Sequence, residues 1–310
     1  MPKDTVAEII EKATTDPETY RAMAAKEADV WSKNLTNPQT LRVLQEDKKA
    51  AGQLKLGRHR TALSRLLAKH QLKPARGLSL GCGAGRAERQ LLGAGVCSRF
   101  HGIDIAPDAV ASAEQIAAEM GLAITYEVQD INFVTLPPES YDLIIAQTSL
   151  HHVLRLEHVA DEISKCLASG GLLWIHDYIG ESQLQYSDKR LEIINDLLKL
   201  LPAKLRFNHL KRTVHKAVSR KDPGTLVSPF ESIRSGEIRE IFLARFDVVE
   251  CIENDAFMAQ VVLKGTRANY LQDENTRAIF EVLLYVDRLL IEHGILPPMS
   301  GQYLLKKRSS

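Results

Sequence analysis

The first quarter of the chain has a helical pattern of apolar and polar positions. Apolar residues recur at helical spacing past Leu41 and Leu63, and no segment there predicts a strand. Asp16-Pro17 predicts a helix start, because Asp is a favoured N-cap and Pro fits the first turn of a helix. We therefore expect residues 1–75 to form a helical N-terminal extension that acts as a lid.

From residue 76 onward, short apolar runs alternate with helical segments. Strands are predicted at Gly77–Leu80, Phe100–Ile105, Ile124–Val128, Tyr141–Ala146 and Leu172–Ile175, and helices at Ala87–Leu92, Asp108–Met120 and Glu157–Leu167. Strand and helix alternating at this spacing indicate a parallel sheet with helices on both faces. We therefore predict a doubly wound α/β domain over residues 76–310.

Residues 180–230 interrupt this alternation just after a predicted strand. The pattern there predicts two helices, at Asp188–Leu201 and Leu205–Ser219. An insertion at the carboxyl end of a strand lies where open α/β sheets bind ligands, so we expect 180–230 to be a cap. The remaining predicted elements are a helix at Ile233–Ala244, a strand at Phe246–Ile252, a helix at Thr276–Glu292 and a strand at Gln302–Leu305.

Composition narrows the class of protein. The 310 residues include 40 Lys and Arg against 39 Asp and Glu, a formal charge of +1, so general nucleic-acid or membrane-surface binding is not expected. The four cysteines show no CxxC and no metal-ligand spacing, which predicts free thiols in a reducing cytoplasm and no metal. The charged first residues and the lack of an apolar run of about 18 residues predict neither a signal peptide nor a membrane span.

A glycine-rich loop follows the first predicted strand. Gly81, Gly83 and Gly85 give the spacing GxGxG, and glycines there let the chain turn sharply and let a ligand approach the backbone. A dinucleotide fingerprint needs a further glycine where Arg86 stands, and this counts against a nicotinamide cofactor.

Acidic residues end the next two predicted strands. Asp104 is suited to accept both hydrogens of a ribose diol. Asp130, with the apolar Ile131 beside it, suits an adenine. Either carboxylate alone could be an ordinary helix N-cap, but their joint occurrence at successive strand ends favours a nucleoside site.

Residues 78–178 resemble a class I S-adenosylmethionine-dependent methyltransferase. The resemblance lies in the glycine loop, Asp104, Asp130-Ile131, the Tyr-Asp-Leu-Ile-Ile strand with its Leu-His-His-Val continuation, and Ala168-Ser169-Gly170-Gly171. It implies a seven-stranded Rossmann-like sheet with the last strand antiparallel and S-adenosylmethionine across the carboxyl edge. The implied cofactor residues are Gly81, Gly83 and Gly85 for the methionine part, Asp104 with Ile105 for the ribose, Asp130 with Ile131 for the adenine, and Gln147 near the amino-acid end. Many members carry an acidic residue where this chain has Ser79.

The implied activity is in-line transfer of a methyl group to an oxygen or nitrogen of a small-molecule acceptor. Such an acceptor often needs a base, and His151 or His152 is our candidate because the free pKa of histidine lies near neutral pH. Either histidine could instead simply cap a helix, and Asp177 and Tyr178 are weaker candidates for the base. The alternatives are a non-catalytic cofactor-binding subunit and a nicotinamide-dependent oxidoreductase.

One segment of the cap gives a hint about the acceptor. Residues 204–221 hold seven basic residues and no acidic one, and on a helix Arg212, Lys216 and Arg220 would share a face. Such a face suits an anionic group on the acceptor or is simply solvated. RNA is disfavoured because aromatic residues for base stacking are missing. The sequence leaves the oligomeric state open, a homo-oligomer included.

Overall fold

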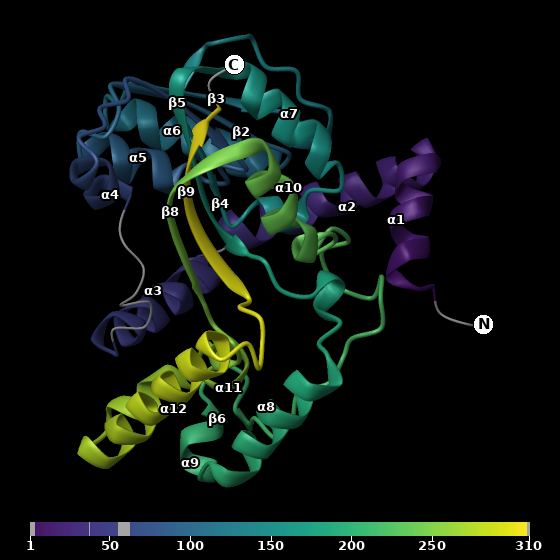
Figure 1. Cartoon of the computed structure of the whole chain (residues 1–310), viewed down its shortest axis with the longest axis vertical. Helices are drawn as coiled ribbons and strands as arrows, with labels where there is room; N and C mark the ends of the chain where they lie inside the picture. The colour runs from purple at the N-terminus through teal and green to yellow at the C-terminus, as the bar shows by residue number, and fades with distance from the viewer. Residues whose placement is uncertain (1–3, 37, 55–62, 309–310) are drawn as a thin grey trace.

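The computed structural model describes residues 4–36, 38–54 and 63–308. Within them one mixed sheet of seven strands has the order β3-β2-β1-β4-β5-β9-β8 (Figure 1). The strands are β1 (Arg76–Leu80), β2 (Arg99–Asp104), β3 (Ile124–Val128), β4 (Tyr141–Gln147), β5 (Leu167–Tyr178), β8 (Phe246–Asn254) and β9 (Ser300–Lys307). Because β9 pairs antiparallel with both β5 and β8, six strands share one direction and the last opposes them. The predicted doubly wound, Rossmann-like fold is confirmed.

Helices cover both faces of this sheet. The helices α4 (Leu63–Lys69), α5 (Arg86–Gly93) and α6 (Pro107–Glu119) lie on one face, and α7 (Leu156–Cys166) and α10 (Ile238–Arg245) on the other (Figure 1). Strand β4 shows why both faces are filled. Leu143 and Ile145 pack toward α4, whereas Ile144 and Ala146 pack toward α7, and all four are fully buried. A continuous apolar run therefore forms a strand covered on both sides.

The N-terminal extension is helical, as predicted. It contains α1 (Val6–Thr15), α2 (Pro17–Thr36) and α3 (Pro38–Gln53), and α2 packs against α6. The Asp16 carboxylate accepts hydrogen bonds from the backbone N–H groups of Glu18 and Thr19, which confirms the predicted start of α2. No helix in the described part of the chain is long and apolar enough to span a membrane.

A second apolar core lies beyond the edge of the sheet. It joins α8 (Asp188–Leu200) and α9 (Ala203–Arg206) to α11 (Met258–Val261), the 3-10 turn η5 (Arg267–Leu271) and α12 (Glu274–Glu292) (Figure 1). Phe280 and Leu283 of α12 share this core with Ile194 and Leu198 of α8. The segment between β8 and β9 therefore builds this region together with residues 180–230, which the sequence analysis missed.

The predicted helix at Leu205–Ser219 is wrong. After α9 the chain forms a hairpin of two short strands, β6 (Phe207–Asn208) and β7 (Thr213–Val214). The Asn208 side chain accepts hydrogen bonds from the backbone N–H groups of Leu210 and Lys211, both at 3.0 Å. An Asn side chain that closes a turn in this way competes with helix formation. The shared helical face of basic residues consequently does not exist.

Candidate active site

The glycine loop lies between β1 and α5 in a conformation that requires glycine. The φ angles of Gly81, Gly83 and Gly85 are +69°, +52° and +69°. A Cβ atom on Gly81 would lie 2.4 Å from the Cβ of Ser149, which lies two residues before His151. The loop and the turn after β4 are thus in direct contact, which brings two sequence-predicted groups of residues together.

Asp104 is joined to this loop by hydrogen bonds. Its Oδ2 accepts from the N–H of Gly83 at 2.7 Å, and its Oδ1 accepts from the N–H of Ala106 at 2.9 Å. The residue is 9% exposed, and burial raises the pKa of its carboxyl group. Asp104 therefore holds the loop in place, and its contact with a ribose stays a prediction.

Asp130 lies at the carboxyl end of β3, against the N-terminal extension. The hydroxyl group of Tyr20 in α2 donates to Asp130 Oδ2 at 2.6 Å. Both residues line a cavity of about 500 Å³, together with Phe133, whose side chain is 53% exposed. Ile131, the predicted adenine contact, is half-buried and packs against the main core, and its contact with an adenine stays a prediction. Phe133 and Tyr20 are residues that the sequence analysis missed.

The histidine pair forms the short turn η2 (Leu150–His152) after β4. The two imidazole centroids are 4.0 Å apart. Asp177, at the carboxyl end of β5, accepts hydrogen bonds from the backbone N–H groups of Ser149 and Leu150 and also binds Nδ1 of His151. The role of Asp177 is therefore to orient His151, whereas the sequence analysis considered it as a weak candidate for the base.

Helix α2 reaches the second histidine. Glu27 Oε1 lies 3.0 Å from His152 Nδ1, and the Glu27 carboxylate also accepts from the Ser228 hydroxyl and the Trp31 indole. Glu27 is only 2% exposed. The N-terminal extension, the turn after β4 and the cap segment thus meet at one carboxylate. The sequence gave no signal for this contact, because Glu27 lies on a polar helix far along the chain from both partners.

Glu231 completes the group of charged side chains at the histidines. Its two carboxylate oxygens lie 3.8 Å from His151 Nε2 and 4.0 Å from His152 Nε2. Burial alone would lower the pKa of His151, but the charge and hydrogen bond of Asp177, with smaller contributions from Glu231 and Glu27, raise it overall. The pKa of Asp177 is lowered, because the charge of His151 and several hydrogen bonds outweigh burial.

Glu88 is a buried acid that the sequence analysis did not single out. It lies in α5, is 0% exposed, and neither of its carboxyl oxygens has a hydrogen-bond partner among the described residues. Burial raises its pKa, and the nearby Ser79 side chain opposes this rise only in part. The Glu88 carboxyl group thus lies near Ser79, the position where many members of the resembled family carry an acidic residue.

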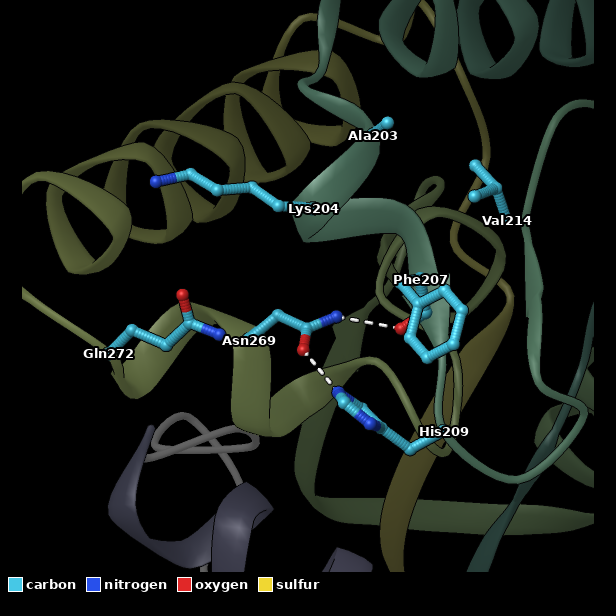
Figure 2. Close-up of a pocket in the computed structure, with 7 residues that line it drawn as sticks. All are labelled: Ala203, Lys204, Phe207, His209, Val214, Asn269 and Gln272. Carbon is cyan, nitrogen blue, oxygen red and sulfur yellow. Dashed lines mark hydrogen bonds between the residues drawn. The ribbon is translucent and has the colours of Figure 1, made fainter.

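The other predicted site residues are less informative. Gln147 is exposed at the end of β4, and Ile105 is half-buried after β2. Tyr178 is half-buried, and the burial of its hydroxyl group raises the pKa of that group and disfavours it as a base. A second cavity, of about 390 Å³, lies between the cap and η5, where Asn269 binds His209 (Figure 2). It contains none of the predicted site residues.

Comparison with known proteins accounts for the central part of the chain. Residues 78–175 match the family model of a methyltransferase domain. The match agrees with the resemblance to class I S-adenosylmethionine-dependent methyltransferases. S-adenosylmethionine is the cofactor that this match supports, as the glycine loop and Asp104 indicated.

One curated relative and two solved structures are similar to the chain. The relative is the ubiquinone biosynthesis O-methyltransferase of Methylobacterium sp. (strain 4-46), 30% identical over 105 residues. The match covers 33% of this chain and 41% of that protein. A putative sarcosine dimethylglycine methyltransferase from Galdieria sulphuraria is 19% identical, with a TM-score of 0.47 and coverage of 85% of this chain and 86% of the other. The N-methyltransferase NodS from Bradyrhizobium japonicum WM9 is 15% identical, with a TM-score of 0.47 and coverage of 92% and 100%.

Proposed function

We propose that the protein is an enzyme that transfers the methyl group of S-adenosylmethionine to an oxygen or nitrogen of a small-molecule acceptor. The observation that carries this proposal is the contact between the glycine loop and the histidine turn, at Gly81 and Ser149. It puts residues suited to hold the cofactor beside residues suited to accept a proton. The domain match over residues 78–175 supports the same reaction class.

The transfer is an in-line displacement. A lone pair of the acceptor attacks the methyl carbon, the carbon–sulfur bond breaks, and the sulfonium becomes a neutral thioether. Because the sulfonium is already activated, the protein contributes mainly alignment and exclusion of water, an effect worth about 7–11 kcal/mol in well-oriented systems. The acceptor proton must leave at or near this step.

We propose His151 or His152 as the group that takes this proton. The Nδ1 atom of each ring lies against a carboxylate, Asp177 or Glu27, so the Nε2 atoms are the ones available to a substrate. The O-methyltransferase relative supports an oxygen acceptor, and a hydroxyl group is the kind of acceptor that needs a base. Such a base typically accelerates the reaction by about 10²–10⁴-fold.

We further propose that residues 1–75 and 180–230 close over the acceptor. Glu27 of the extension and Ser228 of the cap share a hydrogen bond next to His152, which supports this arrangement. The expectation of an anionic acceptor rested on a helical basic face that does not form. The charge of the acceptor is therefore not part of this proposal.

The test uses S-adenosylmethionine with a labelled methyl group, a pool of small metabolites as acceptors and a chelator in the buffer. The double variant His151→Gln/His152→Gln should bind the cofactor with unchanged affinity and turn over about 10²–10⁴-fold more slowly. His293→Gln, at an exposed histidine, is the matched control and should keep full activity. Full activity of the double variant would show that neither histidine acts as the base. Cofactor binding by the parent without any labelled product would favour a non-catalytic subunit.

A further inference from the structure

Three metal-binding groups converge at the carboxyl edge of the sheet. The two histidines of η2 and Glu231 each present one ligand atom, and these atoms lie within 4.8 Å of one another. The histidines come from the turn after β4, and Glu231 comes from the loop before α10. The backbone N–H of Ile233 donates to the carbonyl oxygen of His151 at 3.0 Å, so the loop that carries Glu231 is attached to the histidine turn.

The second nitrogen of each imidazole is held by a buried carboxylate. Asp177 faces Nδ1 of His151, and Glu27 faces Nδ1 of His152. The side chain of Asp177 is 0% exposed and that of Glu27 is 3% exposed. A neutral imidazole has one N–H donor and one acceptor nitrogen. If the Nδ1–H group donates a hydrogen bond to the carboxylate, Nε2 carries the lone pair. Both lone pairs then face Glu231.

This arrangement sets three electron-pair donors against one another. Two Nε2 atoms and a carboxylate repel unless a proton or a metal cation lies between them, and Glu27 and Asp177 add further negative charge close by. Carboxylates that hold the outer nitrogens of metal-binding histidines are a regular feature of metal sites, because they fix the ring orientation and raise the basicity of the ligand.

We propose that His151, His152 and Glu231 bind one divalent transition-metal ion of the Zn²⁺, Fe²⁺ or Co²⁺ class. Two imidazoles and one carboxylate are ligands that these ions accept, with coordination positions left over for other groups. The chain would need a small adjustment, because zinc–nitrogen and zinc–oxygen bonds are about 2.0–2.2 Å long. Glu231 can make it, since its side chain is 32% exposed and is not enclosed by the core.

The proposal goes beyond methyl transfer and does not depend on it. A bound ion and a proton from an acceptor would use the same Nε2 atoms. Metal binding is measured with the protein alone, without S-adenosylmethionine or an acceptor. A failure of the metal proposal therefore leaves the methyltransferase proposal intact, and the reverse also holds.

The experiment is a titration of the chelator-treated full chain with Zn²⁺ alone, followed by calorimetry, and with Co²⁺ alone, followed by its visible absorption. We expect one ion per chain. Glu231→Gln and His152→Ala should each weaken binding by at least about 100-fold. Asp177→Asn and Glu27→Gln, which leave the three ligands in place, should weaken it by about 10–100-fold. The controls are Glu292→Gln and His293→Ala, at exposed positions in or after α12, and both should bind as the parent does.

Two results would overturn the proposal. The first is the absence of stoichiometric binding of either ion by the parent chain. The second is an unchanged affinity in Glu231→Gln. Circular dichroism and thermal melting of each variant without metal show whether weaker binding comes from the loss of a ligand or from unfolding. Glu231→Gln is the decisive variant, because its half-buried side chain can change with the least effect on the core.

Discussion

Asp177 accepts a hydrogen bond from Nδ1 of His151 through one carboxylate oxygen. The other oxygen accepts the backbone N–H groups of Ser149 and Leu150 at 3.0 and 2.7 Å. One fully buried carboxylate at the end of β5 thus fixes both the turn after β4 and the orientation of the first histidine.

The variant Asp177→Asn should destabilise the fold. The Asn amide has no negative charge to pair with His151. Its NH₂ group would also face either the backbone N–H groups of Ser149 and Leu150 or Nδ1 of His151. Breaking a buried ionic pair from one side typically costs about 3–5 kcal/mol, which chemical denaturation measures directly. Asp161→Asn, which removes the more exposed pair with Arg245, should cost under about 1 kcal/mol. Equal losses in the two variants would contradict the role assigned to Asp177.

Asp104→Ala should lower the affinity for S-adenosylmethionine by at least about tenfold. The variant removes the predicted contact with the ribose diol, and charge-assisted hydrogen bonds are worth about 1.5–3 kcal/mol each. It also releases the N–H of Gly83 from its hydrogen bond, so the glycine loop loses order. Calorimetry with the cofactor provides the measurement, and Asp108→Ala, at an exposed position in α6, is the control. An unaltered affinity would mean that the ribose lies elsewhere.

Glu88→Gln should stabilise the protein at alkaline pH. Burial raises the pKa of Glu88, so the folded state binds its proton more tightly than the unfolded state, whose pKa is about 4.3. The parent chain therefore loses stability as pH rises from about 4.3 through the folded pKa, and the variant does not. Between the unfolded and the folded pKa the parent loses about 1.4 kcal/mol per pH unit relative to the variant, because the amide does not ionise.

The control for this prediction is Glu114→Gln, at an exposed position in α6, which should show no such pH dependence. Denaturation of the parent and both variants at pH 5 and pH 8 measures the difference. A gain for Glu88→Gln that is the same at both values would show that the carboxyl group does not titrate in this range.

Replacing Arg212 and Lys216 with Glu should leave the KM values for the acceptor and for S-adenosylmethionine unchanged. Both residues are exposed, and the hairpin of β6 and β7 replaces the helix that would have placed them on one face. The measurement is the KM for acceptor and for S-adenosylmethionine, with the parent as reference. A raised KM for the acceptor alone would restore the idea of an anionic group held by the cap.

The sequence was sufficient where a local pattern decides the structure. The strand ends of β1, β2, β3 and β4 agree with prediction to within one residue, because short segments rich in apolar residues alternate with clearly helical ones. The antiparallel last strand also agrees with the resemblance, whereas the hydrogen bond between Asp104 and the glycine loop was not predicted. The cofactor contacts themselves stay predictions, since they depend on a bound ligand.

The sequence failed where a single side chain outweighs the pattern. Residues 205–219 have an acceptable helical composition, yet Asn208 closes a turn by accepting two backbone N–H groups, and the chain turns back as a hairpin. Similarly, α12 was predicted as a helix, but nothing in its pattern showed that its apolar stripe packs with α8 rather than on the sheet.

The sequence by itself determined the fold class, the glycine loop and the position of His151 and His152 at a strand end. Only the tertiary structure decided what surrounds the histidines. Glu27, Asp177 and Glu231 come from three segments that are far apart in the chain, and each is an ordinary polar residue in its own segment. Their contact arises because α2, β5 and the loop before α10 pack around the same edge of the sheet, and packing between distant segments leaves no periodic trace in the sequence.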